Sequence, residues 1–328
     1  MVAFGYTLSS EEHGPTELVD LARRAEEHGF DFVSISDHFH PWVSEQGHSP
    51  FVWSVLGAIS AATEDIEVGV GVTCPTVRIH PAILAQATAT TALLFEGRFS
   101  WGVGSGEALN EHILGDPWPP ADVRLEMLEE AVEVVRELWT GERVTHRGTY
   151  YEVEDAKLFD PPDPAPPIIV SAFGPKAVEL AARIGDGYWG TSPQAELIER
   201  YEEAGGTGPR YGQMQVCWAE DVDDARKTVR RVWPNGGITG QLSQDLPTWA
   251  HFEQAAEMVT EDMAAGSVPC GPELEPFVDS VKAYLDAGYD HVYLHQIGPD
   301  QEGFFRFWDR ELQPALRELS PSEARRAG

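Results

Sequence analysis

The sequence predicts a (β/α)8 barrel with insertions, in which eight parallel strands close on themselves inside a ring of helices. Short apolar runs alternate with helical patterns along the chain, as a parallel sheet covered by helices requires. Eight such runs occur in 328 residues, which favours a closed barrel over an open doubly wound sheet. Several intervening helices carry clear start and stop residues.

The predicted strands are short and rich in β-branched and aromatic residues. They cover residues 3–8, 31–36, 66–72, 98–104, 167–172, 186–191, 213–219 and 290–296. Proline is favoured in the first turn of a helix and glycine just after the last turn. Pro15 and Gly29 therefore bracket one predicted helix, and Pro81 and Gly97 bracket another.

Two segments interrupt the alternation of strands and helices. Residues 142–167 predict a hairpin followed by a proline-rich loop, and residues 234–272 predict a polar excursion with a helix over 247–265. We therefore expect a single barrel domain over 1–328 that carries these two insertions and ends in a flexible tail at 320–328.

The chain is strongly acidic, with 54 Asp and Glu against 23 Lys and Arg, which gives a net charge of −31. This charge disfavours nucleic acid as a partner, because few cations are available to neutralise phosphates. Acidic residues are spread along the whole chain, which favours adaptation to molar salt over an acidic surface that serves a partner. Neither an apolar run long enough to cross a membrane nor a signal peptide is recognisable, so we expect a cytoplasmic protein.

The three cysteines are widely spaced and form no CxxC pair. Cys74, Cys217 and Cys270 therefore predict neither a disulfide framework nor a zinc knuckle, and we expect reduced, partly buried thiols.

Proton-handling residues cluster where the second predicted strand ends. Asp37, His38, His40 and Trp42 follow it within six positions, and histidine is the side chain most easily set for acid–base work near neutral pH. In such barrels the reacting groups lie at the carboxyl ends of the strands, so this segment is the first candidate for an active site.

The third and fourth predicted strands end in glycine-rich segments. Glycines in GVGVTCPT would let a planar ligand approach the backbone closely. The segment GVGSGEALNE presents Gly104, Ser105, Gly106, Glu107 and Asn110 in a tight turn, where successive N–H groups could hold an anion and Glu107 could project into the mouth.

Other interpretations of these residues remain open. His38 and His40 could be a metal pair, but His295 is the only late strand residue that could complete it, so we expect no metal. The GxGxG pattern could indicate a dinucleotide fold, yet it falls on the fourth strand rather than opening a first βαβ unit. His38 could also be a buried core histidine.

Three long segments resemble a known family. SDHFHPW (36–42), CPTVRIHPAILAQA (74–87) and GVGSGEALNE (102–111) are similar to the signature segments of the coenzyme F420-dependent glucose-6-phosphate dehydrogenase group, in the luciferase-like class of oxidoreductases. The likeness runs from about residue 3 to residue 313 and implies a luciferase-like barrel with F420 as cofactor.

The resemblance also implies roles for individual residues. His38 would face the substrate hydroxyl as the base, Asp37 would contact the deazaflavin, and Trp42 and Glu107 would lie beside the ring. The other positions implied to line the coenzyme site are Val72, Cys74, Gly106, Asn110, Ala172, Phe173, Gly174, Thr191 and Ser192. Cys74 stands where a threonine is usual, and Phe173 where a glycine is usual. The resemblance further predicts a non-prolyl cis peptide at Gly71–Val72.

The positions that hold the phosphate in sugar-phosphate members differ here. Gln194 occupies the position of one lysine, and residues 228–281, where those members carry a second lysine, contain none. Asp290 occupies the position of a basic residue before the last strand. A desolvated phosphate needs charge-assisted donors, each contributing about 1.5–3 kcal/mol. We therefore expect a dehydrogenase that moves a hydride between F420 and the hydroxyl carbon of a non-phosphorylated alcohol or sugar.

Three other functions are compatible with the same pattern. They are an F420-dependent sugar-phosphate dehydrogenase, an FMN-dependent monooxygenase of the same class, and a non-catalytic F420-binding protein. We expect a small-molecule substrate and a homodimer, with no nucleic-acid or membrane partner.

Overall fold

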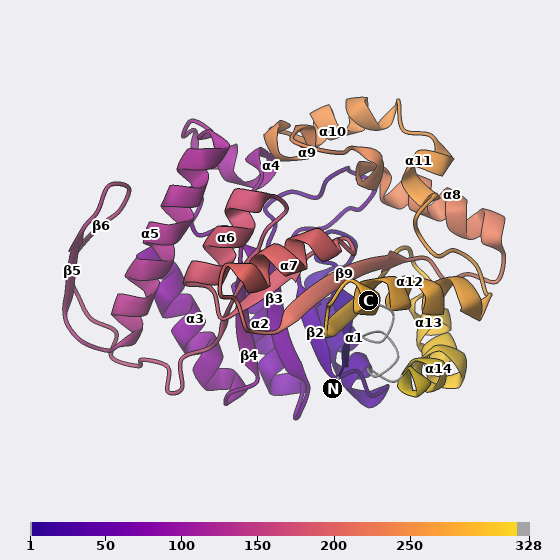
Figure 1. Ribbon diagram of the computed structural model, residues 1–328, viewed down its shortest axis with the longest axis horizontal. Coiled ribbons are helices and arrows are strands. Elements are labelled where there is room, and N and C mark those ends of the chain that lie inside the picture. The colour runs from indigo at the N-terminus through magenta and orange to yellow at the C-terminus, as the bar shows by residue number, and fades with distance from the viewer. Residues whose placement is uncertain (1, 320–328) are drawn as a thin grey trace.

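The computed structural model describes residues 2–319, so the tail predicted at 320–328 lies outside the described residues. Eight parallel strands close into a barrel in the order β1-β10-β9-β8-β7-β4-β3-β2 (Figure 1), which confirms the predicted fold class. The strands are β1 (Ala3–Leu8), β2 (Phe32–Ile35), β3 (Glu67–Thr73), β4 (Phe99–Val103), β7 (Ile168–Ser171), β8 (Gly187–Gly190), β9 (Arg210–Val216) and β10 (His291–Gln296).

Helices alternate with the strands and cover the outside of the barrel. The longer ones are α1 (Pro15–Glu27), α2 (Val52–Ala62), α3 (Pro81–Phe95), α5 (Ala121–Trp139), α6 (Pro175–Ile184), α7 (Ala195–Glu203), α8 (Val222–Val232) and α12 (Leu274–Asp286). The chain then forms α13 (Gln301–Phe307), a π-helical turn (Trp308–Leu312) and α14 (Gln313–Glu318). Within residues 2–319, no helix is both long and apolar enough to cross a membrane.

The predicted strands are all present, and one of them is displaced. β9 begins at Arg210 rather than at 213, because Arg210 and Tyr211 pair with β8. Its end is earlier than predicted too. Cys217 makes only an isolated bridge to Cys270, and the Trp218 amide donates to the Gln296 side chain instead of continuing the ladder.

The first insertion contains the predicted hairpin. β5 (Val144–Arg147) and β6 (Glu152–Ala156) pair antiparallel and extend beyond α5, away from the barrel (Figure 1).

The second insertion differs from the prediction of one helix over 247–265. It forms a 3-10 turn η2 (Pro234–Gly237) and three short helices, α9 (Leu242–Asp245), α10 (Trp249–Ala256) and α11 (Glu261–Ala265). The helix breaks because Val259 turns into a buried apolar cluster and the Thr260 hydroxyl then caps a new helix by accepting from the Met263 amide. Figure 1 shows these helices beside α8 across one end of the barrel.

The barrel interior is filled by large aromatic side chains. Phe32, Trp189, Tyr211 and Tyr293 pack together with Ile169. Because side chains alternate along a strand, residues two positions further on point inward one layer closer to the carboxyl ends. This layer is polar and forms the floor of the mouth, which is the end of the barrel where the carboxyl ends of the strands meet.

The strand-three end has the predicted special backbone. The peptide bond between Gly71 and Val72 is cis. A Cβ at Gly71 would lie 2.5 Å from both Ser34 Oγ and the Trp189 ring, so only glycine fits above the packed interior at this position.

Candidate active site

His38 is held at the carboxyl end of β2 by a buried glutamate. Its Nδ1 lies 3.4 Å from Glu11 Oε1, and the two side chains are 11% and 3% exposed. The Ser36 hydroxyl donates to the other Glu11 oxygen at 2.7 Å, and Ser9 donates to it at 3.1 Å. These bonds fix the carboxylate, and the same His38 Nδ1 also lies 3.3 Å from the His40 carbonyl oxygen, so both groups orient the imidazole. Such an arrangement suits a histidine that accepts a proton.

Asp37 lies in a buried cluster of charges with Arg78 and Glu111. Arg78 Nη2 donates to Asp37 Oδ1 at 2.8 Å, and the Arg78 amide donates to Glu111 Oε2 at 2.6 Å. Burial raises the pKa of Glu111 to about 7, although the amide and charge of Arg78 oppose the rise. Asp37 Oδ2 is buried without a hydrogen-bond partner in the part of the chain that the structure describes, which leaves one carboxylate oxygen for a ligand.

The segment after β4 packs directly against the segment after β3. Gly106 has φ +77°, and a Cβ there would collide with Cys74 Sγ, so the turn requires glycine. Cys74 is buried and its Sγ lies 3.0 Å from Thr76 Oγ1. Glu107 precedes the short helix α4 (Ala108–Glu111) and is partly exposed at the mouth.

Asn110 shapes the loop that carries His38. Its side-chain oxygen accepts from the Phe39 amide at 2.9 Å and from the His40 amide at 3.2 Å. His40 itself turns toward the Leu109 carbonyl, 3.1 Å away, and stacks near His112. His38 and His40 therefore do not converge on one point.

Trp42 connects the site to the second insertion. Its ring lies 5.1 Å from the His38 ring and 5.0 Å from the Phe252 ring of α10. The insertion thus contacts the wall of the mouth through an aromatic pair.

The positions predicted after β7 and β8 lie at the same end of the barrel. Buried tyrosine hydroxyls lie against their backbone. Tyr188 donates to the Ala172 carbonyl and Tyr289 to the Ser192 carbonyl, and the Tyr284 hydroxyl lies between the Gln213 and Thr191 carbonyls, at 2.5 and 3.1 Å. Phe173 is 49% exposed, and Gly174 immediately precedes α6. The last of the predicted coenzyme-site positions, Val72, has its side chain next to Gly104.

Arg124 is a buried cation that sequence reasoning missed. It is 1% exposed and donates to the Pro119 carbonyl at 2.8 Å and to Gln244 Oε1 of α9 at 3.0 Å. The Trp118 ring lies 4.3 Å from its guanidinium carbon. Among the described residues, no carboxylate forms an ion pair with it, and burial lowers its pKa while Asp245 and Glu107 oppose that effect.

The prediction that Asp290 lies in the substrate pocket is wrong. β10 begins at His291, so Asp290 lies at the amino end of its strand, at the opposite end of the barrel from His38. It forms an ion pair with Arg210 at 2.6 Å. Gln194, in contrast, follows β8 at the mouth, where its side chain donates to Ser192 Oγ at 2.8 Å.

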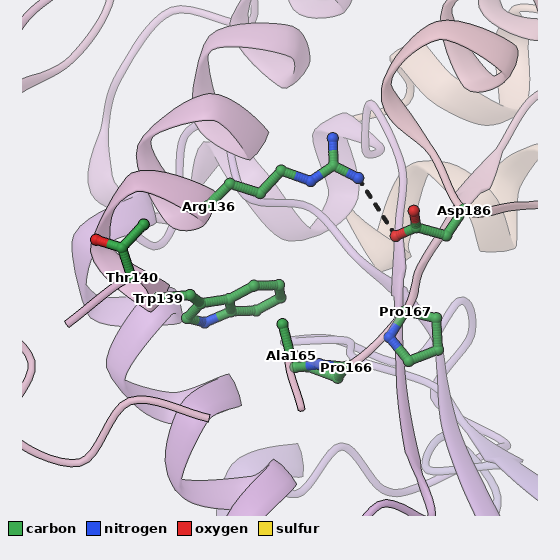
Figure 2. A pocket seen from close by; sticks show the side chains of 7 residues that line it. All are labelled: Arg136, Trp139, Thr140, Ala165, Pro166, Pro167 and Asp186. Atoms are coloured by element: carbon green, nitrogen blue, oxygen red, sulfur yellow. Dashed lines mark hydrogen bonds and ion pairs between the residues drawn. The ribbon is translucent and has the colours of Figure 1, made fainter. Parts of the chain in front are cut away.

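One cavity is remote from the predicted site. It measures about 570 Å³ and lies between the end of α5 and the amino ends of β7 and β8, beside the Arg136–Asp186 ion pair (Figure 2). It contains none of the predicted site residues. No group of three or more potential metal ligands occurs in residues 2–319.

Sequence reasoning also missed Glu11, Arg78 and Glu111. Arg78 lies inside a segment that was singled out, but a single arginine between apolar residues gives no signal of its partners. Glu11 follows the first strand directly, and its position there was the available signal, because the carboxyl ends of neighbouring barrel strands meet at the mouth.

The comparisons with known proteins agree with the barrel fold. The luciferase-like monooxygenase family matches residues 2–291. The chain belongs to this family. A relative from Microbacterium testaceum, named F420-dependent glucose-6-phosphate dehydrogenase, is 38% identical over 96% of this chain and 97% of its own length. Relatives of the same name from Nakamurella multipartita and Nocardia farcinica are each 37% identical, over 97% and 96% of this chain and 97% and 98% of their own lengths.

A solved structure is similar to nearly the whole chain. An F420-dependent secondary alcohol dehydrogenase in complex with an F420-acetone adduct matches with a TM-score of 0.89 and 30% identity, covering 97% of this chain and 99% of that one. The tetrahydromethanopterin reductase of Methanopyrus kandleri, at 23% identity and a TM-score of 0.76, supports the fold alone.

Proposed function

We propose that this member of the luciferase-like family is an F420-dependent dehydrogenase that oxidises a sugar hydroxyl, with glucose 6-phosphate as the first substrate to test. The chain is an F420-dependent oxidoreductase, as are the relatives and the solved structure that match it end to end. The observation that carries the proposal is the contact between Glu11 and His38 at the barrel mouth, since it gives the family fold an oriented base.

The residues at the mouth fit the coenzyme. Asp37 Oδ2 is a buried acceptor without a partner among the described residues, and the glycine at 106 lets the turn after β4 pack directly against Cys74 at the end of β3. We assign Asp37, Val72, Cys74, Gly106 and Asn110 to this side of the site. The backbone at Ala172, Phe173, Gly174, Thr191 and Ser192 would hold the remainder of the coenzyme.

Each polar residue then has a distinct task. F420, when bound, accepts a hydride from the carbon that bears the substrate hydroxyl. His38 takes the proton of that hydroxyl, and Glu11 orients its ring and stabilises the imidazolium that forms. Glu107 would line the coenzyme site, and Trp42, packed between His38 and Phe252 of α10, would limit water access to His38 on that side.

The substrate assignment differs from the expectation drawn from sequence. Asp290, one of the positions used against a phosphate, is at the wrong end of the barrel, so its charge does not bear on the pocket. Arg124 provides a buried positive charge near Glu107 that no carboxylate of the described residues neutralises by an ion pair. Together with the names of the relatives, these observations favour a phosphorylated sugar.

A panel of substrates with purified F420 tests the proposal. We expect loss of the oxidised deazaflavin absorbance with glucose 6-phosphate, and no oxygen consumption when FMN is supplied instead. Binding of F420 without turnover of any alcohol or sugar would refute a dehydrogenase and favour a non-catalytic F420-binding protein.

A non-phosphorylated alcohol or sugar is the second candidate. Gln194 offers a neutral amide where sugar-phosphate members carry a lysine. The solved structure that matches with a TM-score of 0.89 is a secondary alcohol dehydrogenase. A higher kcat/KM for glucose or isopropanol than for glucose 6-phosphate would select this candidate.

A further inference from the structure

A second carboxylate–imidazole pair lies on the other side of β1 from His38. His295 Nε2 lies 2.7 Å from Glu12 Oε1, and the two side chains are 1% and 5% exposed. The other Glu12 oxygen accepts from the Gly298 amide at 2.9 Å. Glu11 and Glu12 are consecutive, and each orients a histidine from one of the two strands that flank β1.

His295 faces the inside of the barrel near its carboxyl end. Tyr293, two residues earlier on β10, packs on Trp189 in the barrel interior, and alternation places His295 on the same inward side one layer higher. Its partner in the ladder is Gln215 of β9, which is half-buried and faces the same way. The Trp233 ring stands at 85° to the imidazole, with the ring centres 4.5 Å apart.

One nitrogen of this imidazole has no partner. Nδ1 is buried and makes no hydrogen bond to any of residues 2–319. Because a carboxylate accepts, Nε2 donates to Glu12, and in the tautomer protonated at Nε2 alone Nδ1 is an acceptor. A buried acceptor that stays unpaired is unfavourable, so the site is completed by a donor from outside the protein chain.

We propose that the Glu12–His295 pair, with Gln215 beside it and Trp233 as an apolar wall, binds a second hydroxyl of the substrate. His38 acts on the hydroxyl that is oxidised, and His295 accepts a hydrogen bond from another hydroxyl of the same molecule. The mouth therefore selects a polyhydroxylated substrate, such as a sugar, over an alcohol with a single hydroxyl. This inference rests on the proposed dehydrogenase function and specifies its substrate class.

Two variants separate the two nitrogens of His295. His295→Gln keeps an amide near the Nε2 position, where it still donates to Glu12, and removes the acceptor at Nδ1. His295→Asn keeps a polar group near the Nδ1 position and loses the contact with Glu12. His291→Ala is the matched control, because His291 faces inward on the same strand at the opposite end of the barrel.

The assay compares kcat/KM for glucose 6-phosphate, glucose and isopropanol with F420. We expect His295→Gln to lower kcat/KM for both sugars about 10- to 100-fold, mainly through KM, the size expected for one lost hydrogen bond to substrate. Isopropanol oxidation should change less than about 3-fold, and His295→Asn should retain more sugar activity than His295→Gln. An equal loss on sugars and isopropanol, or a larger loss in His295→Asn, would show a structural role and overturn the subsite.

Titration calorimetry of glucose 6-phosphate without coenzyme gives an independent readout. Weaker binding to His295→Gln than to the wild type and His291→Ala supports the subsite, and unchanged binding overturns it. Wild-type protein that binds the sugar but reduces no F420 with any substrate would refute the proposed dehydrogenase while leaving the subsite standing.

Discussion

Replacing Glu111 by glutamine should stabilise the protein above neutral pH and have little effect on stability at acidic pH. Glu111 is 1% exposed and lies beside Arg78 and Asp37. Glutamine keeps an oxygen that can accept from the Arg78 amide, so the substitution removes mainly the ionisable group.

The sign follows from the direction of the pKa shift. Burial raises the pKa of Glu111 from 4.5 to about 7, so the folded protein binds this proton more tightly than the unfolded chain. The contribution of Glu111 to stability is therefore full below pH 4.5 and is lost as the pH rises to about 7. Each pH unit in that window corresponds to about 1.4 kcal/mol, so the pH-dependent loss in the wild type approaches about 3 kcal/mol.

Urea unfolding of wild type and Glu111→Gln between about pH 3 and pH 8, at constant salt, measures this difference. The difference in the free energy of unfolding between the variant and the wild type should increase steadily, in favour of the variant, up to about pH 7. Glu130 is a control of opposite sign. Burial raises the pKa of Glu130, but hydrogen bonds from the amides of Thr149, Tyr150 and Tyr151 outweigh this effect and lower the pKa. Glu130→Gln should lose stability at neutral pH and recover as the pH falls. A difference for Glu111→Gln that does not vary with pH would refute the reasoning.

Three further predictions test the site and the surface. His38→Ala should lower turnover about 10²–10⁴-fold while F420 affinity stays within a few-fold, and wild-type turnover would shift the base assignment to His40. Gly106→Ala should destabilise the fold by at least about 1–2 kcal/mol, because φ is +77° and Cys74 Sγ blocks the Cβ; an unchanged melting temperature would contradict this. Melting temperatures in about 0.1 M and about 3 M KCl should differ by many degrees, since salt screens the excess carboxylates, and equal values would assign the acidity another purpose.

The barrel was predictable from sequence because its signal is repeated eight times. Each strand is an apolar run between helices with recognisable ends, and errors at single boundaries do not change the alternation. The second insertion carries no such redundancy. The pattern over 247–265 is helical on both sides of Val259, and only the tertiary burial of Val259 and the cap at Thr260 divide it.

The candidate site was predictable where a motif is local. Asp37, His38 and Trp42 are close in sequence and lie together in the structure. Their partners come from other strand ends, and no local pattern connects Glu11 to His38. The error at Asp290 has a different origin. A residue just before a strand lies at the amino end of the barrel, and only residues just after strands reach the mouth.

The mouth differs from the rest of this acidic chain in how its charges are arranged. Many surface carboxylates face solvent, as in the exposed pair between Lys176 and Asp122. At the mouth, Glu11, Glu12 and Asp37 are buried, and each contacts a histidine or an arginine from a different segment. A buried carboxylate without such a partner would be strongly disfavoured, so each pair also fixes the segments that carry it. The side chains that we propose as acid–base and substrate-binding groups are therefore oriented by the fold itself, which would lower the cost of organising them during a reaction.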